Sequence, residues 1–261
     1  MRRGGIGAWI VIAAGVIYFL APLVATVEFS LRMRRGAYSF DAYRVVFSSG
    51  AFQASFLYST LLALATIVVV ALIVVPTAYW VRLRLPWLAG IVEFITLLPL
   101  IIPAIVLVFG YIRLYGSSSL LPLTATSLGS DALLMLGYVG LSLPYMYRSV
   151  DAALRTLDVR ALTEAAESQG AGALTILTRV IFPNVRAGVL SGAFLTFAIV
   201  IGEFTFASLL DRPAFGPYLQ LVGASRAYEP AALAAMAFAL TWACLGLIQF
   251  VGGAQAPGVR R

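Results

Sequence analysis

The sequence predicts an all-α integral membrane protein with six transmembrane helices, and three observations support this fold class. Hydrophobic residues make up 61% of the 261 residues and charged residues only 11%, whereas about a quarter of an ordinary soluble domain is charged. The mean hydropathy is +0.96. Several apolar runs exceed the roughly 20 residues that a helix needs to cross about 30 Å of hydrocarbon. These runs are continuously apolar, which is typical of helices and not of alternating strands.

Six apolar runs define the expected helices, in order near residues 9–29, 58–81, 88–112, 132–147, 187–210 and 231–251. The first run follows Arg2 and Arg3 and has no clean cleavage site, so we read it as an uncleaved span. The third contains Pro99 and Pro103, which remove backbone donors and are expected to bend the helix.

The arginines predict the orientation of these helices. With the N-terminus inside, eleven of the eighteen arginines lie in cytoplasmic segments and seven in outer segments. Because basic residues favour the cytoplasmic side, we expect both termini in the cytoplasm. Arg32, Arg34 and Arg35 run against this bias, since they follow the first span on its outer side. The outer loop 31–56 is rich in aromatic residues, which either cover the helix bundle or form a docking surface for an outer partner.

The absence of certain residue types excludes several kinds of chemistry. The chain has no His and no Lys. A phosphate-binding P-loop needs its Lys, and zinc proteases and Ser–His pairs need His. Cys244 is the single cysteine, which excludes an intrachain disulfide, and we expect a buried thiol and no metal site. We read the net charge of +7 as orientation by basic loops and not as binding to nucleic acid.

The loop 151–186 is charged and helix-forming, although it lies between apolar runs. Its periodicity predicts an amphipathic helix over 150–169, with Asp151 near the start, where an acidic group suits the helix dipole. Helical spacing also predicts two ion pairs, Arg155 with Asp158 and Arg160 with Glu164.

Two glycines interrupt this loop. Gly170 and Gly172 are expected to break the helix, and a second short helix is expected over 173–181. Pro183 then ends that helix or starts the next span. Periodicity alone leaves open whether the loop is only an amphipathic connector on the membrane surface.

A longer pattern in this loop resembles a known family. Glu164-Ala165-Ala166 is followed by three residues, Gly170, nine residues and Val180-Ile181-Phe182-Pro183. This is similar to the EAA loop of ABC importer permease subunits, in which E-A-A, three residues, G and nine residues precede I-x-L-P. Val180 and Phe182 are apolar replacements, and Gln169 and Gly172 depart from the residues common in the family.

Other stretches resemble the same family in the expected order, so that the resemblance covers about residues 39–250. They are Ser39–Tyr43, Tyr58–Thr60, Pro76–Tyr79 with Arg82, and Leu98–Pro103. Gly202-Glu203-Phe204 looks like the branch that handles polyamines, ferric iron or related solutes.

The resemblance implies a single permease domain over residues 1–261 with the type I ABC importer fold, in the inner membrane of a bacterium. We call residues 151–186 the coupling loop, because the resemblance implies that it contacts a cytoplasmic ABC ATPase dimer. The coupling residues would be Glu164, Ala165, Ala166, Gly170, Ala171, Gly172, Leu174 and Pro183. A second permease subunit, identical or homologous, and an extracytoplasmic solute-binding protein would complete the assembly in the bilayer. ATP and Mg²⁺ would bind the ATPase, so this chain is expected to hold no cofactor, no metal and no catalytic residue.

Glu203 is the one acidic residue well inside an expected span, which makes it a candidate for the solute path. It either contacts a cationic solute or fixes helix packing through hydrogen bonds, and Pro99 and Pro103 either line the path or only accommodate packing. A polyamine or similar cation is favoured, while anions such as sulfate or phosphonates, and thiamine, stay open. An ion-coupled secondary transporter is the alternative function, but such a transporter is expected to contain inverted repeats and several intramembrane charges. A membrane-embedded enzyme is a third possibility, for which the sequence leaves few chemistries.

Overall fold

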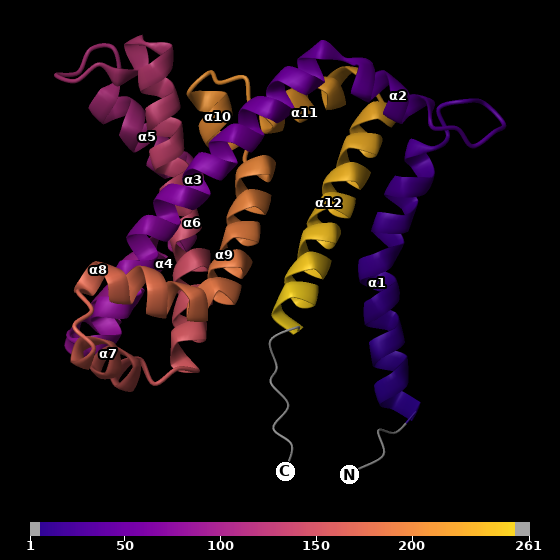
Figure 1. The fold of residues 1–261 in the computed structure, drawn as a ribbon. Helices are drawn as coiled ribbons and strands as arrows, with labels where there is room; N and C mark the ends of the chain where they lie inside the picture. The colour runs from indigo at the N-terminus through magenta and orange to yellow at the C-terminus, as the bar shows by residue number, and fades with distance from the viewer. Residues whose placement is uncertain (1–5, 254–261) are drawn as a thin grey trace. The chain divides into compact units, whose positions relative to one another are not determined.

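The computed structural model describes residues 6–253, without the side chains of residues 6, 8, 241, 244, 245 and 247–253. The thiol of Cys244 and the four terminal arginines therefore lie outside the described part. All the regular elements of the described chain are helices, and its one β feature is an isolated bridge between Arg34 and Ala37, which confirms the all-α prediction. The helices are α1 (Ile6–Ser30), α2 (Asp41–Ser48), α3 (Gly50–Leu83), η1 (Pro86–Leu88), α4 (Ala89–Ile101), α5 (Ala104–Tyr115), η2 (Leu123–Ala125), α6 (Ser127–Arg155), α7 (Val159–Ser168), α8 (Ala173–Thr175), η3 (Ile176–Ile181), α9 (Phe182–Gly202), α10 (Thr205–Leu209), α11 (Phe215–Ser225) and α12 (Tyr228–Gly253) (Figure 1).

The chain forms two compact units, residues 1–53 with 218–242, and residues 54–217 with 243–261. In the first unit, the rings of Phe29 in α1 and Tyr228 in α12 stack with centroids 4.9 Å apart. Ser30 and Tyr43 of α2 share a hydrogen bond of 2.8 Å. The second unit contains the coupling loop and both hydrophobic clusters of the described residues.

Four of the six expected spans have the length and apolar character to cross a membrane. Among the described residues these are Trp9–Ser30, Gly50–Leu83, the run Ala173–Gly202, and α4 with α5 if that bent pair is one span. The fourth expected span lies in α6, which is 29 residues long but less apolar, since it carries Asp131 and several serines and glycines. The sixth lies in α12, of which Tyr228–Leu240 counts as a shorter apolar helix. Both stay predictions as membrane spans.

The third expected span is bent by 96° between α4 and α5, which confirms the effect expected of its prolines. Pro99 lies inside α4, and Pro103 is the N-cap residue of α5. Ile102 between the two helices is extended, with ψ 121°. A residue that precedes proline is pushed out of the α-helical region, so Pro103 fixes where α4 must end.

The continuous helix expected over 150–169 is wrong, because α6 extends to Arg155 and α7 begins only at Val159. The carboxylate of Asp158 accepts a 3.0 Å hydrogen bond from the backbone N–H of Ala161 and so caps the start of α7. Arg155 pairs with Asp151 instead of with Asp158, its expected partner.

Asp151 lies in the last turns of α6 and not at a helix start. Its carboxylate accepts hydrogen bonds from Arg155 Nε at 2.8 Å and from Arg82 of α3 at 3.1 Å. It thus joins the C-terminal ends of α3 and α6 at the start of the coupling loop.

The helices α6 and α9 pack closely because α9 presents small residues to α6. A Cβ atom added to Gly188 would lie 2.6 Å from the carbonyl oxygen of Ser149, and one added to Gly192 would lie 2.5 Å from the sulfur of Met146. Glycines four residues apart lie on one helix face and let two backbones approach. This glycine pair was not predicted from the sequence.

Candidate functional site: the coupling loop

The Gly170 turn explains the spacing of the family pattern in this loop. The N–H of Ala171 donates to the carbonyl of Ala166 at 3.1 Å, and the N–H of Gly170 donates to the carbonyl of Glu167 at 2.9 Å. These two bonds form a Schellman motif, which closes the C-terminus of α7. The motif requires a left-handed conformation at the residue just after the helix cap, which here is Gly170. Gly170 has φ +80°, so the position four residues after Ala166 favours glycine.

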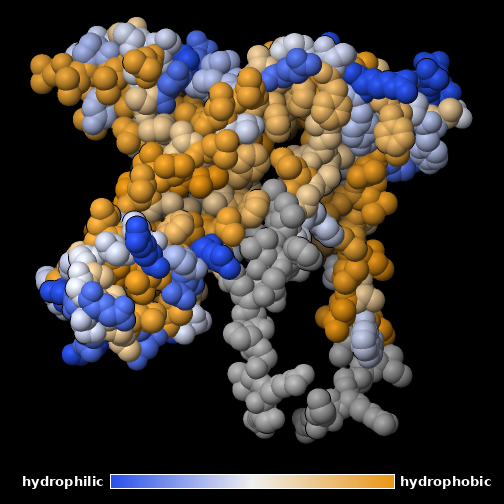
Figure 2. Space-filling view, viewed as in Figure 1, coloured by the Kyte–Doolittle hydropathy of each residue, from blue (hydrophilic) through white to orange (hydrophobic). Residues whose placement is uncertain are grey.

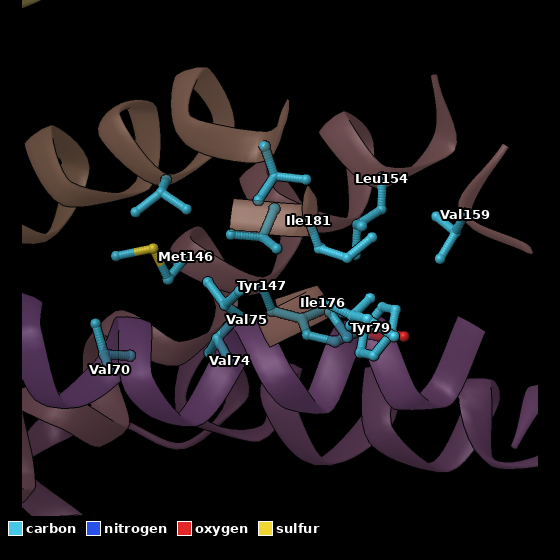
Figure 3. Packing of buried hydrophobic residues seen from close by; sticks show 14 of the residues in the cluster. Val70, Val74, Val75, Tyr79, Met146, Tyr147, Leu154, Val159, Ile176 and Ile181 are labelled. Atoms are coloured by element: carbon cyan, nitrogen blue, oxygen red, sulfur yellow. The ribbon is translucent and has the colours of Figure 1, made fainter. Parts of the chain in front are cut away.

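Side chains from α3 and α6 anchor the coupling loop. Val159 of α7 and Ile176 and Ile181 of η3 are buried in one apolar cluster (Figure 3). The partners labelled in the figure are Val70, Val74, Val75 and Tyr79 from α3, and Met146, Tyr147 and Leu154 from α6. Because protein interiors are close-packed, this cluster holds the coupling loop tightly against α3 and α6.

A buried hydrogen bond also fixes α7 to α3. The hydroxyl oxygens of Tyr79 and Thr163 lie 3.1 Å apart. Thr163 donates its hydroxyl hydrogen to the carbonyl of Val159 at 2.7 Å, so Tyr79 is the donor of this bond. An ion pair of 3.6 Å between Glu167 of α7 and Arg84, the residue that follows α3, adds an exposed contact.

The eight predicted coupling residues fall on two sides of the loop. Ala166 and Ala171 are half-buried and pack against the apolar cluster. The other six are exposed, namely Glu164, Ala165, Gly170, Gly172, Leu174 and Pro183. Leu174 is 74% exposed, so most of its apolar side chain is accessible on this side of the loop. Figure 2 shows mostly hydrophilic side chains over this loop, in contrast to the apolar helices of the same unit.

The predicted ion pair of Arg160 with Glu164 is present on the exposed side of α7, with Nε and Oε1 2.7 Å apart. The hydrogen bond to Glu164, and then its charge, raise the pKa of the Arg160 guanidinium. A guanidinium is charged at physiological pH in any case, and the ion pair further favours that form. An exposed pair of this kind contributes little to stability, so it mainly gives the surface its charge pattern.

The second short helix does not end at residue 181, because Ala173–Gly202 is one continuous helical run. It contains a π-helical turn over Ile176–Ile181, which ends two residues before Pro183. Pro183 has no N–H to donate to the carbonyl four residues earlier, and wide π turns occur where the regular ladder is disturbed. Pro183 is the second residue of α9 and does not break the helical run. Gly172 caps this run with φ −77° and no side-chain bond, as its lack of a side chain predicts.

Glu203 lies between helices and not inside one. The helix α9 ends at Gly202, and the Glu203 carboxylate accepts hydrogen bonds from the backbone N–H groups of Phe206 at 2.8 Å and Ala207 at 3.2 Å. Its side chain is nearly buried, with 8% of the residue exposed. Both carboxylate oxygens therefore cap α10, in agreement with the expected alternative that Glu203 fixes helix packing through hydrogen bonds. Neither of these two bonds involves Pro99 or Pro103.

The anchoring residues Tyr79, Thr163 and Ile176 were not predicted from the sequence. Tyr79 lies in a long apolar run, and no local pattern pairs it with a threonine 84 residues later. For the second helix the sequence favoured Leu174, Leu177 and Val180 as the apolar face, whereas Ile176 and Ile181 are the fully buried residues. Ile176 and Ile181 are five residues apart, a separation that suits a π-helical turn. That spacing is the feature of the sequence from which these two buried residues could have been predicted.

Comparison with known proteins identifies the family. No protein-family model matches the chain. It is 30% identical over 196 residues to the molybdenum transport system permease protein of Mycobacterium tuberculosis, covering 73% of this chain and 71% of that protein. The chain belongs to the permeases of ABC importers. The permease is also 27% identical over 224 residues to the spermidine/putrescine transport system permease protein of Haemophilus influenzae, covering 80% and 76% of the two chains.

A third relative and a solved structure extend the comparison. The permease is 32% identical over 142 residues to a probable molybdenum ABC transporter permease protein of Haloferax volcanii, covering 54% of this chain and about half, 52%, of that protein. A chain of the bacterial alginate ABC transporter, solved in complex with an alginate-bound periplasmic protein, superposes with a TM-score of 0.69. That likeness covers 97% of this chain and 96% of the other at 14% identity, which shows a shared fold.

Proposed function

We propose that this permease forms half of a solute path through the bacterial inner membrane and is driven from its coupling loop. The observation that supports this proposal is the two-sided loop: one side is packed into α3 and α6, and the other leaves Leu174 74% exposed. A short helix with one exposed side can seat in a groove of a partner protein. The partner is a cytoplasmic ABC ATPase dimer, which holds ATP and Mg²⁺, while this chain has no catalytic role and binds no cofactor.

Force on α7 would move the helices without deforming the loop. The Schellman turn fixes the end of α7, and Tyr79 holds α7 to α3 by a buried hydrogen bond. Because packed elements move as rigid bodies, closure of the ATPase dimer would tilt α3 and α6 together and open the path on the other side.

The remaining partners follow from the family. We propose a second permease subunit, identical or homologous, and an extracytoplasmic solute-binding protein, with both termini of this chain in the cytoplasm. The alginate transporter, which shares the fold, was solved with its periplasmic protein.

The test of the coupling surface is co-purification of the ATPase with two matched variants. Leu174→Asp places a charge on the proposed contact surface, whereas Leu120→Asp places the same charge on a residue 102% exposed in the loop after α5. We expect Leu174→Asp to release the ATPase and Leu120→Asp to retain it. Equal retention by both variants would show that the ATPase does not bind at this surface.

The solute is proposed at the level of two classes. The motif around Glu203 and the Haemophilus relative favour a polyamine, although the Glu203 carboxylate already accepts two backbone hydrogen bonds. The Mycobacterium and Haloferax relatives favour a molybdenum oxyanion. ATPase stimulation of the assembled transporter and its binding protein, measured with spermidine and with molybdate, separates these classes. Stimulation by neither solute would reject both.

A further inference from the structure

A basic turn follows the first apolar helix, and neither coupling nor translocation accounts for it. Arg32, Arg34 and Arg35 lie directly after α1, whose apolar span ends at Ser30. The turn is closed by a 2.8 Å hydrogen bond from the N–H of Ser39 to the carbonyl of Leu31. The three arginines are therefore held directly after the end of the apolar helix.

These arginines surround a pocket of about 380 Å³. Arg32 pairs with Glu28, and Arg34 pairs with Asp41 at 2.5 Å. Arg35 is exposed and has no ion pair within residues 6–253. The pocket thus contains at least one positive charge that no carboxylate of the described chain balances.

An apolar groove of about 630 Å³ adjoins this pocket. It runs between α1 and α12 in the same compact unit, and Tyr38 lines both the groove and the pocket. Apart from Glu28 and Tyr38 its lining is apolar, with Leu20, Val24, Phe238 and Trp242 among the larger side chains. In Figure 2, hydrophilic side chains gather over the turn and hydrophobic side chains cover α1 next to it.

We propose that the basic turn and the groove together bind one anionic phospholipid. The phosphate would bind the arginines, with Tyr38 at the boundary, and an acyl chain would lie in the groove. Basic clusters next to a membrane helix attract anionic headgroups, and both volumes are those of ligand pockets. In the predicted orientation the arginines lie on the outer side, against the usual bias of basic residues. A bound anionic lipid accounts for that exception.

Charge complementarity favours a lipid over a protein. A second copy of this chain carries a net charge of +7, so it does not complement the arginines as a whole. A soluble acidic protein could reach the turn, but the groove lies beside the apolar span of α1, where a soluble surface does not enter.

The test uses the assembled transporter in nanodiscs and the fluorescence of Trp242, which lines the groove. The other three tryptophans, Trp9, Trp80 and Trp87, are replaced by Phe. Phosphatidylglycerol with brominated acyl chains should quench Trp242 at a lower mole fraction than brominated phosphatidylcholine. Because each arginine near an anionic lipid surface is worth a factor of about five, Arg35→Gln should reduce this preference about fivefold.

A matched control separates local binding from net charge. The triple variant Arg32→Gln/Arg34→Gln/Arg35→Gln should abolish the preference, whereas Arg44→Gln/Arg113→Gln/Arg226→Gln removes the same charge from arginines outside the pocket and should keep it. Size-exclusion chromatography shows whether the variants remain assembled.

Four results would overturn the proposal. Equal quenching by the two lipids would show no headgroup selection, and equal loss in both triple variants would show a general charge effect. Quenching only in the disassembled chain would show that protein covers the groove. Displacement of the lipid by millimolar inorganic phosphate would assign the pocket to free anions.

Discussion

Gly170 provides the sharpest test of the coupling loop, because its replacement changes the backbone and nothing else. A Cβ atom at Gly170 meets no atom within 4 Å, so Gly170→Ala creates no clash. Its φ of +80° is left-handed, and a non-glycine residue there costs about 1–2 kcal/mol. That energy lowers the ratio of correctly folded to misfolded loop by a factor of roughly 5–30.

Gly172 is the matched control, because it lies two residues away in the same turn. A Cβ atom added at Gly172 also meets no atom within 4 Å, but the φ of this residue is −77°, which any residue adopts. We expect Gly170→Ala to lower solute-stimulated ATP hydrolysis of the assembled transporter severalfold and Gly172→Ala to leave it nearly unchanged. Gly170→Asn should recover part of the loss, because Asn tolerates the left-handed region.

The assay is ATP hydrolysis in proteoliposomes with and without the solute-loaded binding protein, at matched transporter content. If Gly170→Ala and Gly172→Ala behave alike, the Schellman turn does not position the coupling surface. The same conclusion follows if the solute-loaded binding protein stimulates ATP hydrolysis by Gly170→Ala as much as by the unaltered transporter.

Three further substitutions, with Gly140→Ala as a control, test the packing that surrounds the loop and the proposed path. Tyr79→Phe removes the hydrogen bond to Thr163 and should lower the stability of the folded protein by about 0.5–1.5 kcal/mol. This loss would be measured as a lower thermal midpoint of the purified transporter, and an unchanged midpoint would show that the bond does not stabilise the fold. Gly192→Ala places a Cβ atom 2.5 Å from a methionine sulfur of α6 and should cost about 1–3 kcal/mol. Gly140→Ala, with no atom within 4 Å, should be neutral or slightly stabilising, and equal midpoints for the two would refute the close helix contact. Glu203→Gln leaves one acceptor oxygen for two backbone N–H groups of α10 and should lower the midpoint, whereas a change only in solute affinity would assign Glu203 to the path.

Features that depend on neighbouring residues could be predicted from the sequence. The break at Gly170 follows from a backbone conformation that glycine favours, and the bend after α4 follows from Pro103, which excludes the helical conformation from the residue before it. The pair of Arg160 and Glu164 follows from helical spacing. Each of these features is decided within a few residues.

Features that depend on competition or on distant residues could not be predicted. Asp158 suits both a helical ion pair and an N-cap, and the cap is what forms. The end of α9 at Gly202 lies within a continuous apolar run, so hydropathy alone did not reveal that Glu203 caps a new helix. The bond of Tyr79 to Thr163 joins residues 84 positions apart, a contact that only the folded chain specifies.

The length of α3 has a consequence for the membrane around the permease. At 1.5 Å per residue, its 34 residues extend about 51 Å, whereas the hydrocarbon layer is about 30 Å thick. The helix must therefore tilt or project into the headgroup region, and a change in bilayer thickness alters that tilt. Tyr79, near the C-terminal end of α3, holds α7 by a hydrogen bond. Thinner and thicker bilayers should therefore change the number of ATP molecules hydrolysed for each solute imported.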